Sequence, residues 1–402
     1  MAVSLSKRVQ KVKPSPTLAV TARAAKLKAE GKDIIGLGAG EPDFDTPSFI
    51  ADAGVDAIRK GLTRYTAVDG TGELKDAIIA KFARDNALRY ERNQIVVSCG
   101  AKQTCFNVCA AVLDPGDECI IPAPYWVSYP DMALLADGVP VGVYAGPEQG
   151  YKITPAQLAA AVTPRSKLLF LNSPSNPTGA AYTKAELQAF GAVLAKHPRI
   201  VVAADEMYEH IYWAREPFTS FAQANPQLYD RTVTINGCSK AYAMTGWRIG
   251  YTAGPKALIE AMNKLQSQMT SNITSFCMPA IVEALSNPAM EDEVEKMRQA
   301  FEKRGAHIWQ RLNSLPGFKC VRPTGAFYAF PSIAGALDKP LGKTGAKPKD
   351  AIEFCRIVLD EAHVALVPGN DFGFPDHVRL SFATSMEQID KGINRMEKIL
   401  TP

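Results

Sequence analysis

The chain has 402 residues, of which 47% are hydrophobic and 21% charged, and its formal net charge is +4. This length exceeds that of one simple core, so we expect two domains, and so small a net charge gives no reason to expect nucleic-acid binding. Residues 1–20 lack the apolar stretch of a secretory signal, and no uncharged apolar run reaches the roughly 18 residues of a membrane helix.

Eight cysteines and five histidines are scattered along the sequence. No CxxC pair occurs, which argues against zinc-ribbon and thioredoxin-like sites. Cys105 and Cys109 have the spacing of one helix face, where packing is the commoner role. The histidines form no close cluster in the sequence, so we expect no metal site. This cysteine usage fits a reducing, cytoplasmic setting.

From about residue 94 to residue 270, short apolar runs alternate with helical patterns. The expected strands lie at 95–97, 119–121, 141–143, 168–171, 200–203 and 232–235. One helix is expected to begin near Lys102, and another to cover 183–196, where Thr183 and Glu186 form a capping box. This alternation predicts an α/β fold with a mostly parallel sheet covered by helices on both faces.

After about residue 290 the pattern changes. Residues 291–312 predict a long, charged amphipathic helix, and residues 325–330 and 377–382 predict strands of a second, smaller sheet. Residues 338–350, rich in Lys, Gly and Pro, predict an exposed loop.

Small or polar residues follow several of the expected strands. Gly100, Asn172, Asp205 and Lys240 all come after apolar runs. In an open α/β sheet the carboxyl ends of the strands meet at one edge, and ligands bind there. The sequence therefore predicts that these residues lie together at a binding site.

Lys240, Asp205 and Arg248 together indicate pyridoxal phosphate. This cofactor needs an amine for a Schiff base, a carboxylate beside its ring nitrogen and a cation for its phosphate. Asp205 would keep the ring nitrogen protonated, and Lys240 would carry the substrate Cα proton as general base and then acid. A solvated lysine and a capping aspartate are the alternatives. The Ser239-Lys240 step and the Gly-Trp-Arg-Ile-Gly run at 246–250 favour the cofactor.

Other residues are candidates for the same site. The turn at 98–103 joins a strand to a helix whose N-terminus could hold a phosphate. Trp126 offers a flat face for the cofactor ring, and Tyr208 and Asn176 could hydrogen-bond its O3′ oxygen. Arg379 is the candidate for the substrate α-carboxylate, through a bidentate hydrogen bond. A core aromatic and an ordinary ion pair are the alternatives for Trp126 and Arg379.

Six motifs occur in one order along the chain, at 38–47, 125–130, 172–179, 205–208, 239–248 and 379–381. With them, nearly the whole chain resembles the fold-type I, class I aminotransferases, most of all the bacterial aspartate aminotransferases and the subgroup that includes prephenate aminotransferases. The resemblance implies a large domain, 49–290, with a mostly parallel seven-stranded sheet covered by helices. It implies a smaller α+β domain formed by 1–48 and 291–402, and a homodimer with shared active sites.

The resemblance also implies roles for individual residues. Lys240 would be the Schiff-base lysine, with Asp205 and Tyr208 as further catalytic residues. The implied cofactor-binding residues are Gly100, Ala101, Lys102, Trp126, Asn176, Asp205, Tyr208, Ser239, Lys240, Arg248 and, reaching the neighbouring subunit, Tyr65. The implied substrate-binding residues are Gly40, Trp126, Asn176, Arg379, Lys102, Thr17 and Lys13.

The expected reaction is ping-pong amino transfer from aspartate to 2-oxoglutarate, giving oxaloacetate and glutamate. Residues 267–278 contain no arginine, although one branch of aspartate aminotransferases reads the distal carboxylate with an arginine there. Lys102 and hydroxyls near Ser15 and Thr17 would take that role here. Amino transfer to prephenate or to aromatic oxo acids is the alternative, because Lys13 matches a position linked to prephenate use.

Two other classes share this fold. C–S lyases use the same kind of site for eliminations. Transcription regulators carry a basic winged-helix segment ahead of the fold, whereas here the fold is expected to begin almost at Met1.

Overall fold

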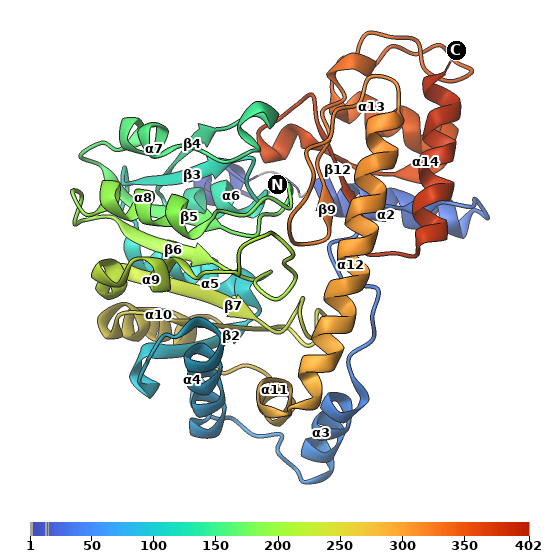
Figure 1. Cartoon of the computed structure of the whole chain (residues 1–402). Helices are drawn as coiled ribbons and strands as arrows, with labels where there is room; N and C mark the ends of the chain where they lie inside the picture. Colours follow the sequence, from blue (N-terminus) through green and yellow to red (C-terminus); the bar gives the residue numbers. More distant parts are fainter. Residues whose placement is uncertain (1–2, 13, 15, 402) are drawn as a thin grey trace.

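The larger part of the molecule is built on one central sheet (Figure 1). The computed structural model describes residues 3–12, 14 and 16–401, without the side chains of 16–18. The strands of the central sheet are β2 (Ile95–Cys99), β3 (Glu118–Ala123), β4 (Val139–Tyr144), β5 (Ser166–Asn172), β6 (Val201–Asp205), β7 (Thr232–Gly237) and β8 (Ile249–Ala253). Their spatial order is β2-β8-β7-β6-β5-β3-β4. Only the pairs that involve β8 are antiparallel, so the predicted mostly parallel sheet is confirmed.

The sequence prediction found every strand of this sheet except β8. This strand follows the loop that carries Lys240 and Arg248, with no helix between it and β7. The strand–helix alternation on which the prediction rested is therefore absent before β8. All five residues of β8 are buried, as expected for a strand that lies between two others.

Successive residues of a strand point to opposite faces of a sheet, and each face has its own core. Leu168 and Phe170 of β5 pack on one face, and Leu169 and Leu171 pack on the other. The first face is covered by α5 (Ala101–Val112), α6 (Ser128–Leu135) and α10 (Lys256–Met269). The second is covered by α7 (Pro155–Ala161), α8 (Lys184–Leu194) and α9 (Phe221–Ala224). Near the β2 edge, a further core contains α3 (Ser48–Arg59), α4 (Gly72–Asn86) and α11 (Cys277–Ser286).

Two local predictions on these helices are confirmed. At the start of α8, the hydroxyl of Thr183 accepts a hydrogen bond from the Glu186 N–H, and the Glu186 carboxylate accepts one from the Thr183 N–H. Cys105 and Cys109 are fully buried in α5, as packing residues would be. All eight cysteines are unpaired.

A second group of elements lies beside the sheet, on the right of Figure 1. It comprises α2 (Pro16–Ala29), β1 (Ile35–Gly36), α12 (Ala289–Ser314), β9 (Tyr328–Ala329), α13 (Ala351–Ile357), β10 (Val364–Ala365), β11 (Val367–Pro368), β12 (Val378–Ser381) and α14 (Met386–Leu400). The predicted long helix and second sheet are present, the latter as the antiparallel order β11-β12-β9. Most of residues 338–350 are exposed, as expected for a loop.

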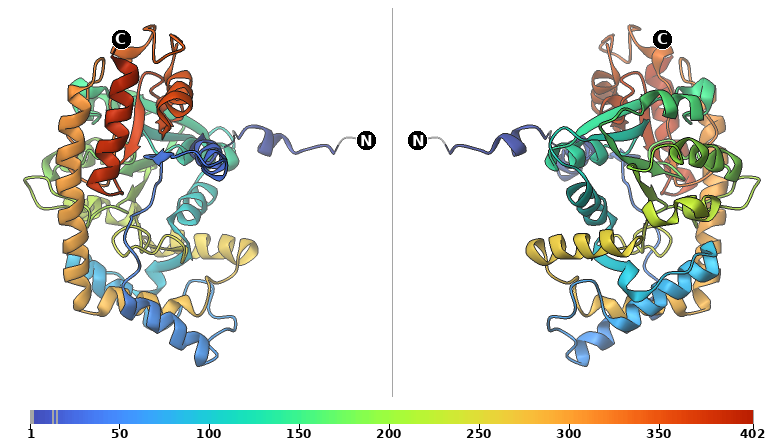
Figure 2. Two further views of the ribbon diagram at one scale, coloured as in Figure 1. Left: turned by 90° about the vertical axis from the view of Figure 1, so that its right-hand side faces the viewer. Right: turned by 90° about the vertical axis from the view of Figure 1, so that its left-hand side faces the viewer.

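Segments from both ends of the chain share the core of this second group. β1 pairs in parallel with β10, and Ile35 and Leu37 pack with residues of α12 and α14. Figure 2 shows α12 running along most of one side of the molecule. The short helix α1 (Lys7–Gln10) buries no residue and projects outward, and its Arg8 forms an ion pair with Asp137. Among the described residues, no helix has the combined length and apolar character that crossing a membrane requires.

Candidate active site

A cavity of about 310 Å³ lies at the carboxyl ends of the central strands, next to the second group of elements. Of the residues predicted for the site, those that line it are Gly40, Ala101, Lys102, Trp126, Asn176, Asp205, Tyr208, Ser239, Lys240, Arg248 and Arg379. They come from segments up to 339 residues apart in the sequence, which the fold brings to one edge of the sheet, as the rule for open α/β sheets predicts.

At one end of the cavity, the N-terminus of α5 and the guanidinium of Arg248 lie close together. Gly100, at the N-cap of α5, has a φ of +78°. A Cβ there would lie 2.4 Å from Nη2 of Arg248, and one on Gly250 would lie 2.2 Å from the backbone N of Ala101. The two glycines thus allow this close approach. Helix N–H groups and a guanidinium together suit an anion such as a phosphate.

Asp205 ends β6 and is buried, with 6% of its surface exposed. Its Oδ2 accepts a hydrogen bond from the Tyr129 hydroxyl at 2.5 Å, and its Oδ1 accepts one from the Met207 N–H at 3.2 Å. Burial raises the pKa of the carboxyl group, although these hydrogen bonds and the charge of Lys240 act in the opposite direction. A buried carboxylate at this position would be stabilised by a cationic N–H group in the cavity.

Lys240 follows β7 and donates a hydrogen bond to the Gly40 carbonyl. Burial lowers the pKa of its ammonium to about 8, with Arg379 and Arg248 acting in the same direction and Glu41 and Asp205 opposing it. A substantial share of the side chain is therefore neutral at slightly alkaline pH. A neutral amine is the form that attacks a carbonyl group or accepts a proton.

Arg379 of β12 is 3% exposed, and its guanidinium is fixed by neutral partners. Nη1 donates to Asn176 Oδ1 at 3.0 Å and Nη2 donates to the Gly38 carbonyl at 2.9 Å. Its Nε is buried and has no hydrogen-bond partner in the described part of the chain. Among the described residues, no carboxylate forms an ion pair with this charge, so a ligand carboxylate in the cavity would compensate it.

Six lining residues had no individual role in the sequence prediction, although Asn172 was expected at this edge of the sheet: Val127, Ser128, Tyr129, Asn172, Met207 and Tyr328. The hydroxyls of Tyr328 and Tyr208 are 3.0 Å apart, and the Tyr328 ring centroid lies 4.6 Å from the Arg379 guanidinium carbon. Tyr129 and Asn172 stand inside motifs that the sequence singled out. Tyr328 stands only in a predicted strand, where no local signal separates it from a core aromatic residue.

Four predicted residues are not among those that line the cavity. Gly100 immediately precedes the lining residue Ala101. Tyr65 is 90% exposed, between α3 and α4. Lys13 lies outside the described residues, and Thr17 lies in α2 with its side chain outside the description. The roles given to Tyr65, Lys13 and Thr17 therefore stay predictions.

The profile of the family described as aminotransferase class I and II matches residues 32–396. The chain belongs to this family. Its members include an aspartate/prephenate aminotransferase of Nitrosomonas europaea, 52% identical over 399 residues, which cover 99% of this chain and 100% of that protein. An aspartate/prephenate aminotransferase of Cereibacter sphaeroides is also 52% identical, with 98% of each chain covered.

Solved aminotransferase structures have the same fold. The aspartate aminotransferase of Rhizobium meliloti superposes with a TM-score of 0.95 at 45% identity, covering 99% of each chain. That of Thermus thermophilus with maleate superposes with a TM-score of 0.92 at 41% identity, covering 99% of this chain and 100% of the other. This aminotransferase therefore shares its architecture with them over essentially its whole length.

Proposed function

We propose that the protein is a pyridoxal-phosphate-dependent aminotransferase that moves the amino group of aspartate to 2-oxoglutarate in a ping-pong reaction. The observation that carries the proposal is that one cavity holds an amine of lowered pKa, a buried carboxylate and a buried guanidinium, on Lys240, Asp205 and Arg379. Each of these groups matches one requirement of amino transfer on this cofactor.

The donor set of the cavity fits pyridoxal phosphate. The N-terminus of α5 with Arg248 and Ser239 suits the phosphate, and Asp205 suits the ring nitrogen. Trp126 and Tyr208 also line the cavity and would contact the ring. When bound, the cofactor supplies an aldehyde for amines and a ring that takes up the electron pair left at the substrate Cα.

Lys240 would hold the cofactor and carry the proton. Its amine, neutral in part because burial lowers its pKa to about 8, would be the nucleophile toward an aldehyde bound in the cavity. The same Nζ would remove the substrate Cα proton and later return a proton, as general base and then acid. Asp205 would favour a positive charge at the ring nitrogen, because a buried carboxylate stabilises a protonated partner.

Arg379 and Asn176 hold the α-carboxylate of the amino acid. The hydrogen bonds to Asn176 and to the Gly38 carbonyl fix the plane of the guanidinium before substrate arrives. A guanidinium fixed in this way loses little entropy on binding a carboxylate in a bidentate contact. It orients the substrate so that Cα faces Lys240.

The preference for a dicarboxylate is supported by the comparisons and by Lys102. The relatives are named aspartate aminotransferases, and one structure of the Thermus thermophilus enzyme carries maleate, a dicarboxylate, in its name. Lys102 lines the cavity with its Nζ 4.9 Å from the Trp126 ring. We propose that it binds the distal carboxylate, together with hydroxyls near Ser15 and Thr17.

Prephenate is the second candidate acceptor. The relatives from Nitrosomonas europaea and Cereibacter sphaeroides, each 52% identical, are named aspartate/prephenate aminotransferases. Prephenate carries two carboxylates, so the same cationic groups could bind it. We propose it as an additional acceptor rather than a replacement for 2-oxoglutarate.

We further propose a cytoplasmic homodimer, with residues 49–290 as the cofactor-binding domain and residues 1–48 with 291–402 as the smaller domain. The eight unpaired cysteines support a reducing compartment. The exposed Tyr65 supports the dimer, since this large aromatic residue is 90% exposed in the single chain. The core shared by β1, α12 and α14 supports the domain boundaries.

Stopped-flow absorbance tests the proposal, with the cofactor-loaded protein mixed with single amino acids and no oxo-acid acceptor. We expect aspartate and glutamate to remove the absorbance band of the Lys240-bound cofactor rapidly. A response to aromatic amino acids alone would contradict the dicarboxylate preference. Release of pyruvate and ammonia from cystathionine without an acceptor would identify a C–S lyase instead.

A further inference from the structure

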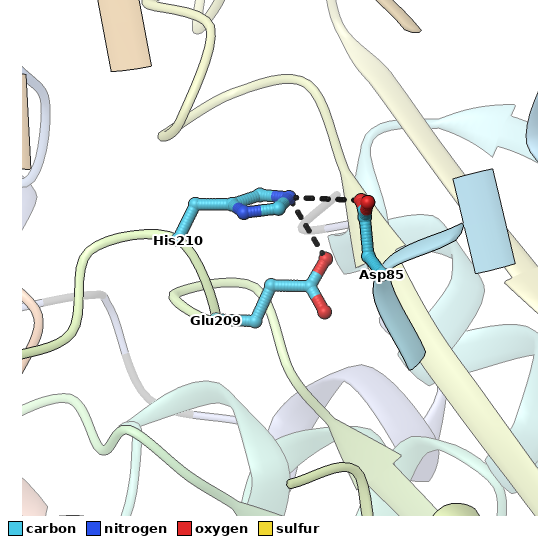
Figure 3. Close-up of side chains that lie close together, drawn as sticks. All are labelled: Asp85, Glu209 and His210. Carbon is cyan, nitrogen blue, oxygen red and sulfur yellow. Dashed lines mark ion pairs between the residues drawn. The ribbon is translucent and has the colours of Figure 1, made fainter. Parts of the chain in front are cut away.

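A second polar cluster lies outside the active-site cavity. Asp85 near the end of α4 and Glu209 and His210 after β6 bring possible metal-ligand atoms within 4.8 Å of one another (Figure 3). His210 Nε2 lies 3.4 Å from Asp85 Oδ2 and 3.3 Å from Glu209 Oε1. This nitrogen is buried without a hydrogen-bond partner among the described residues. Taken alone, these three side chains have the composition of a metal site.

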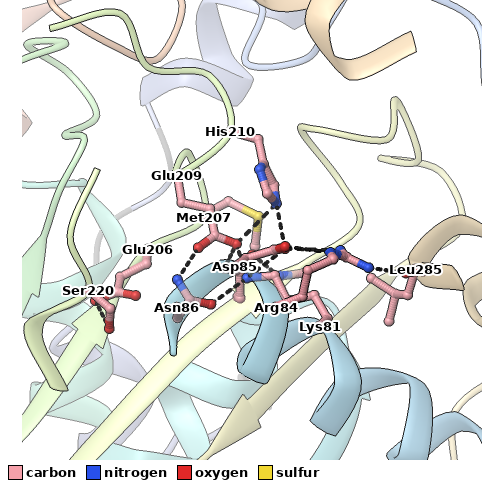
Figure 4. A network of polar contacts seen from close by, with 12 residues as sticks. Lys81, Arg84, Asp85, Asn86, Glu206, Met207, Glu209, His210, Ser220 and Leu285 are labelled. Atoms are coloured by element: carbon pink, nitrogen blue, oxygen red, sulfur yellow. Dashed lines mark hydrogen bonds and ion pairs between the residues drawn. The ribbon is translucent and has the colours of Figure 1, made fainter. Parts of the chain in front are cut away.

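A fourth side chain already supplies the cation. The ammonium of Lys81, on α4, is fully buried, forms an ion pair with the same Glu209 Oε1 and lies 3.7 Å from Asp85 Oδ2 (Figure 4). Since Arg84 also pairs with Asp85, two positive charges face two carboxylates when His210 is neutral. A divalent metal held by these carboxylates would be strongly repelled by the buried ammonium.

The Glu209 carboxylate joins its own turn to two elements, α4 and β7. Besides Lys81 of α4, Asn86 at the end of α4 donates to Oε2 at 2.7 Å, and Asn236 of β7 donates to Oε1 at 2.8 Å. Burial acts to raise the pKa of Glu209, but the charge of Lys81 and the hydrogen bonds from Asn86 and Lys81 outweigh it, so the pKa is lowered. Glu209 therefore stays ionised and keeps its bonds at neutral pH.

Glu209 belongs to the turn that carries two active-site residues. In the turn 205–211, the Glu209 N–H donates to the Glu206 carbonyl and the Ile211 N–H donates to the Tyr208 carbonyl. Asp205 and Tyr208 line the cavity, while Glu209 faces the polar cluster. A displacement of Glu209 would move Tyr208, because the two are adjacent in a closely hydrogen-bonded turn.

A second carboxyl group holds the other side of this turn. Glu206 accepts hydrogen bonds from the Ser220 hydroxyl at 2.9 Å and from the Phe221 N–H at 2.7 Å. Burial and the charge of Glu209 raise the pKa of Glu206 to about 8. Glu206 is therefore largely protonated at neutral pH and does not compete with Glu209 for Lys81.

We propose that the Lys81–Glu209 ion pair positions the active site: it fixes the turn 205–211 against α4 and the end of β7. Asn236, which shares the Glu209 carboxylate, lies four residues before Lys240. One carboxylate thus sets the position of Asp205 and Tyr208 relative to Lys240. Neither Lys81 nor Glu209 lines the cavity, so both are positioning residues. This inference rests on the pyridoxal phosphate site proposed above.

The test compares Lys81→Met, Glu209→Gln and the double variant with wild type. Three quantities are measured: pyridoxal phosphate affinity of the apoprotein by fluorescence titration, hydrogen exchange of the 205–211 amides in the apoprotein, and kcat/KM. The matched control is Glu118→Gln, which neutralises another buried carboxylate, at the first residue of β3 and away from the cavity.

Lys81→Met leaves a buried carboxylate without its ammonium, and we expect exchange in 205–211 to accelerate. We expect cofactor affinity to fall about tenfold and kcat/KM roughly 10²-fold, since small displacements of reacting groups are costly. The double variant should recover much of both losses, because no charge is left unpaired. Glu118→Gln should change neither the affinity nor exchange in 205–211.

Several outcomes would overturn the inference. One is that both single variants have the same hydrogen exchange in 205–211 and the same pyridoxal phosphate affinity as wild type. Another is a loss in kcat/KM that Glu118→Gln reproduces. If Lys81→Met does not fold, Glu209→Gln gives the same comparison with a side chain of the same shape. One zinc ion retained per wild-type chain after dialysis, and lost in His210→Ala, would assign the cluster to a metal instead. If wild type fails to bind pyridoxal phosphate, the proposed function fails, and the exchange of the apoproteins still tests the positioning role.

Discussion

The two ends of the central sheet bury carboxyl groups in opposite ways. At the amino end, Glu118 of β3 accepts hydrogen bonds from two hydroxyls and from Arg165. At the carboxyl end, Asp205 of β6 accepts them from Tyr129 and from one backbone N–H. Burial acts to raise the pKa of both groups. Glu118 nevertheless has a lowered pKa, because its partners outweigh burial, whereas Asp205 has a raised one.

The difference separates a structural end of the sheet from a binding end. Glu118 is compensated by the protein itself. At the other end, the guanidinium of Arg379 has a buried Nε without a partner among the described residues, and burial lowers the pKa of Lys240 to about 8. Buried polar groups that the protein leaves uncompensated are stabilised by a bound ligand. Perturbed pKa values therefore gather at functional sites.

The largest effect should follow from removing the amine at the binding end. We expect Lys240→Met to lower kcat by about 10⁴-fold or more, since it removes both the nucleophile and the general base. Steady-state kinetics with aspartate and 2-oxoglutarate measure this. Lys256→Met, at an exposed side chain of α10, is the control and should keep wild-type kcat. Appreciable turnover in Lys240→Met would contradict the assignment.

The next effect concerns the substrate carboxylate. We expect Arg379→Lys to lower kcat/KM about 10²-fold, because an ammonium cannot make the bidentate contact or keep the bonds to Asn176 and Gly38. The absorbance of the bound cofactor should stay largely intact, because Arg379 holds the substrate. Full activity in this variant would exclude the role given to Arg379.

Two glycines, one at each end of the central sheet, allow a direct comparison of fold stability with cofactor binding. Gly100 at the carboxyl end and Gly116, before β3 at the amino end, both have positive φ. Alanine at either should destabilise the fold by about 1–2 kcal/mol. Only Gly100→Ala should also weaken pyridoxal phosphate binding, by about tenfold, because its Cβ would meet Arg248. A Cβ on Gly116 would meet no atom within 4 Å. Urea unfolding and cofactor titration separate the two effects, and equal cofactor affinities in the two variants would refute this reading.

The smallest effect is a pH dependence of apoprotein stability. The pKa of Lys240 is lowered to about 8 from 10.5, so between these values the unfolded chain binds the proton that the folded chain has lost. Stability should therefore rise with pH across this window, by at most about 1.4 kcal/mol per pH unit. Urea unfolding of wild type and Lys240→Met at several pH values isolates this slope, and parallel curves would contradict it.

Glu118 should act in a different pH range. Its pKa is lowered in the folded state, so its stabilisation is present above the ordinary value of 4.5 and is lost as the pH falls through the folded value. The stability difference between wild type and Glu118→Gln should accordingly shrink in acid and stay constant from pH 8 to pH 10.

Much of the fold was predictable because the signals are local. Apolar runs located all the central strands except β8, and the pairing of Thr183 with Glu186 located the start of α8. β8 was missed because it runs antiparallel after a loop, without the intervening helix on which the prediction depended. The site residues that follow strands were predictable for the same reason, since parallel strands end at one edge.

The sequence by itself determined the types of chemical group available and the edge of the sheet at which they meet. Tertiary structure alone decided their charge states and neighbours: the lowered pKa of Lys240, the contact of Tyr328 with Tyr208, and the burial of Lys81 against Glu209. These contacts join residues more than 100 positions apart. Burial and distance set the energy of a charge, and both depend on how distant segments pack, which no local pattern of residues encodes.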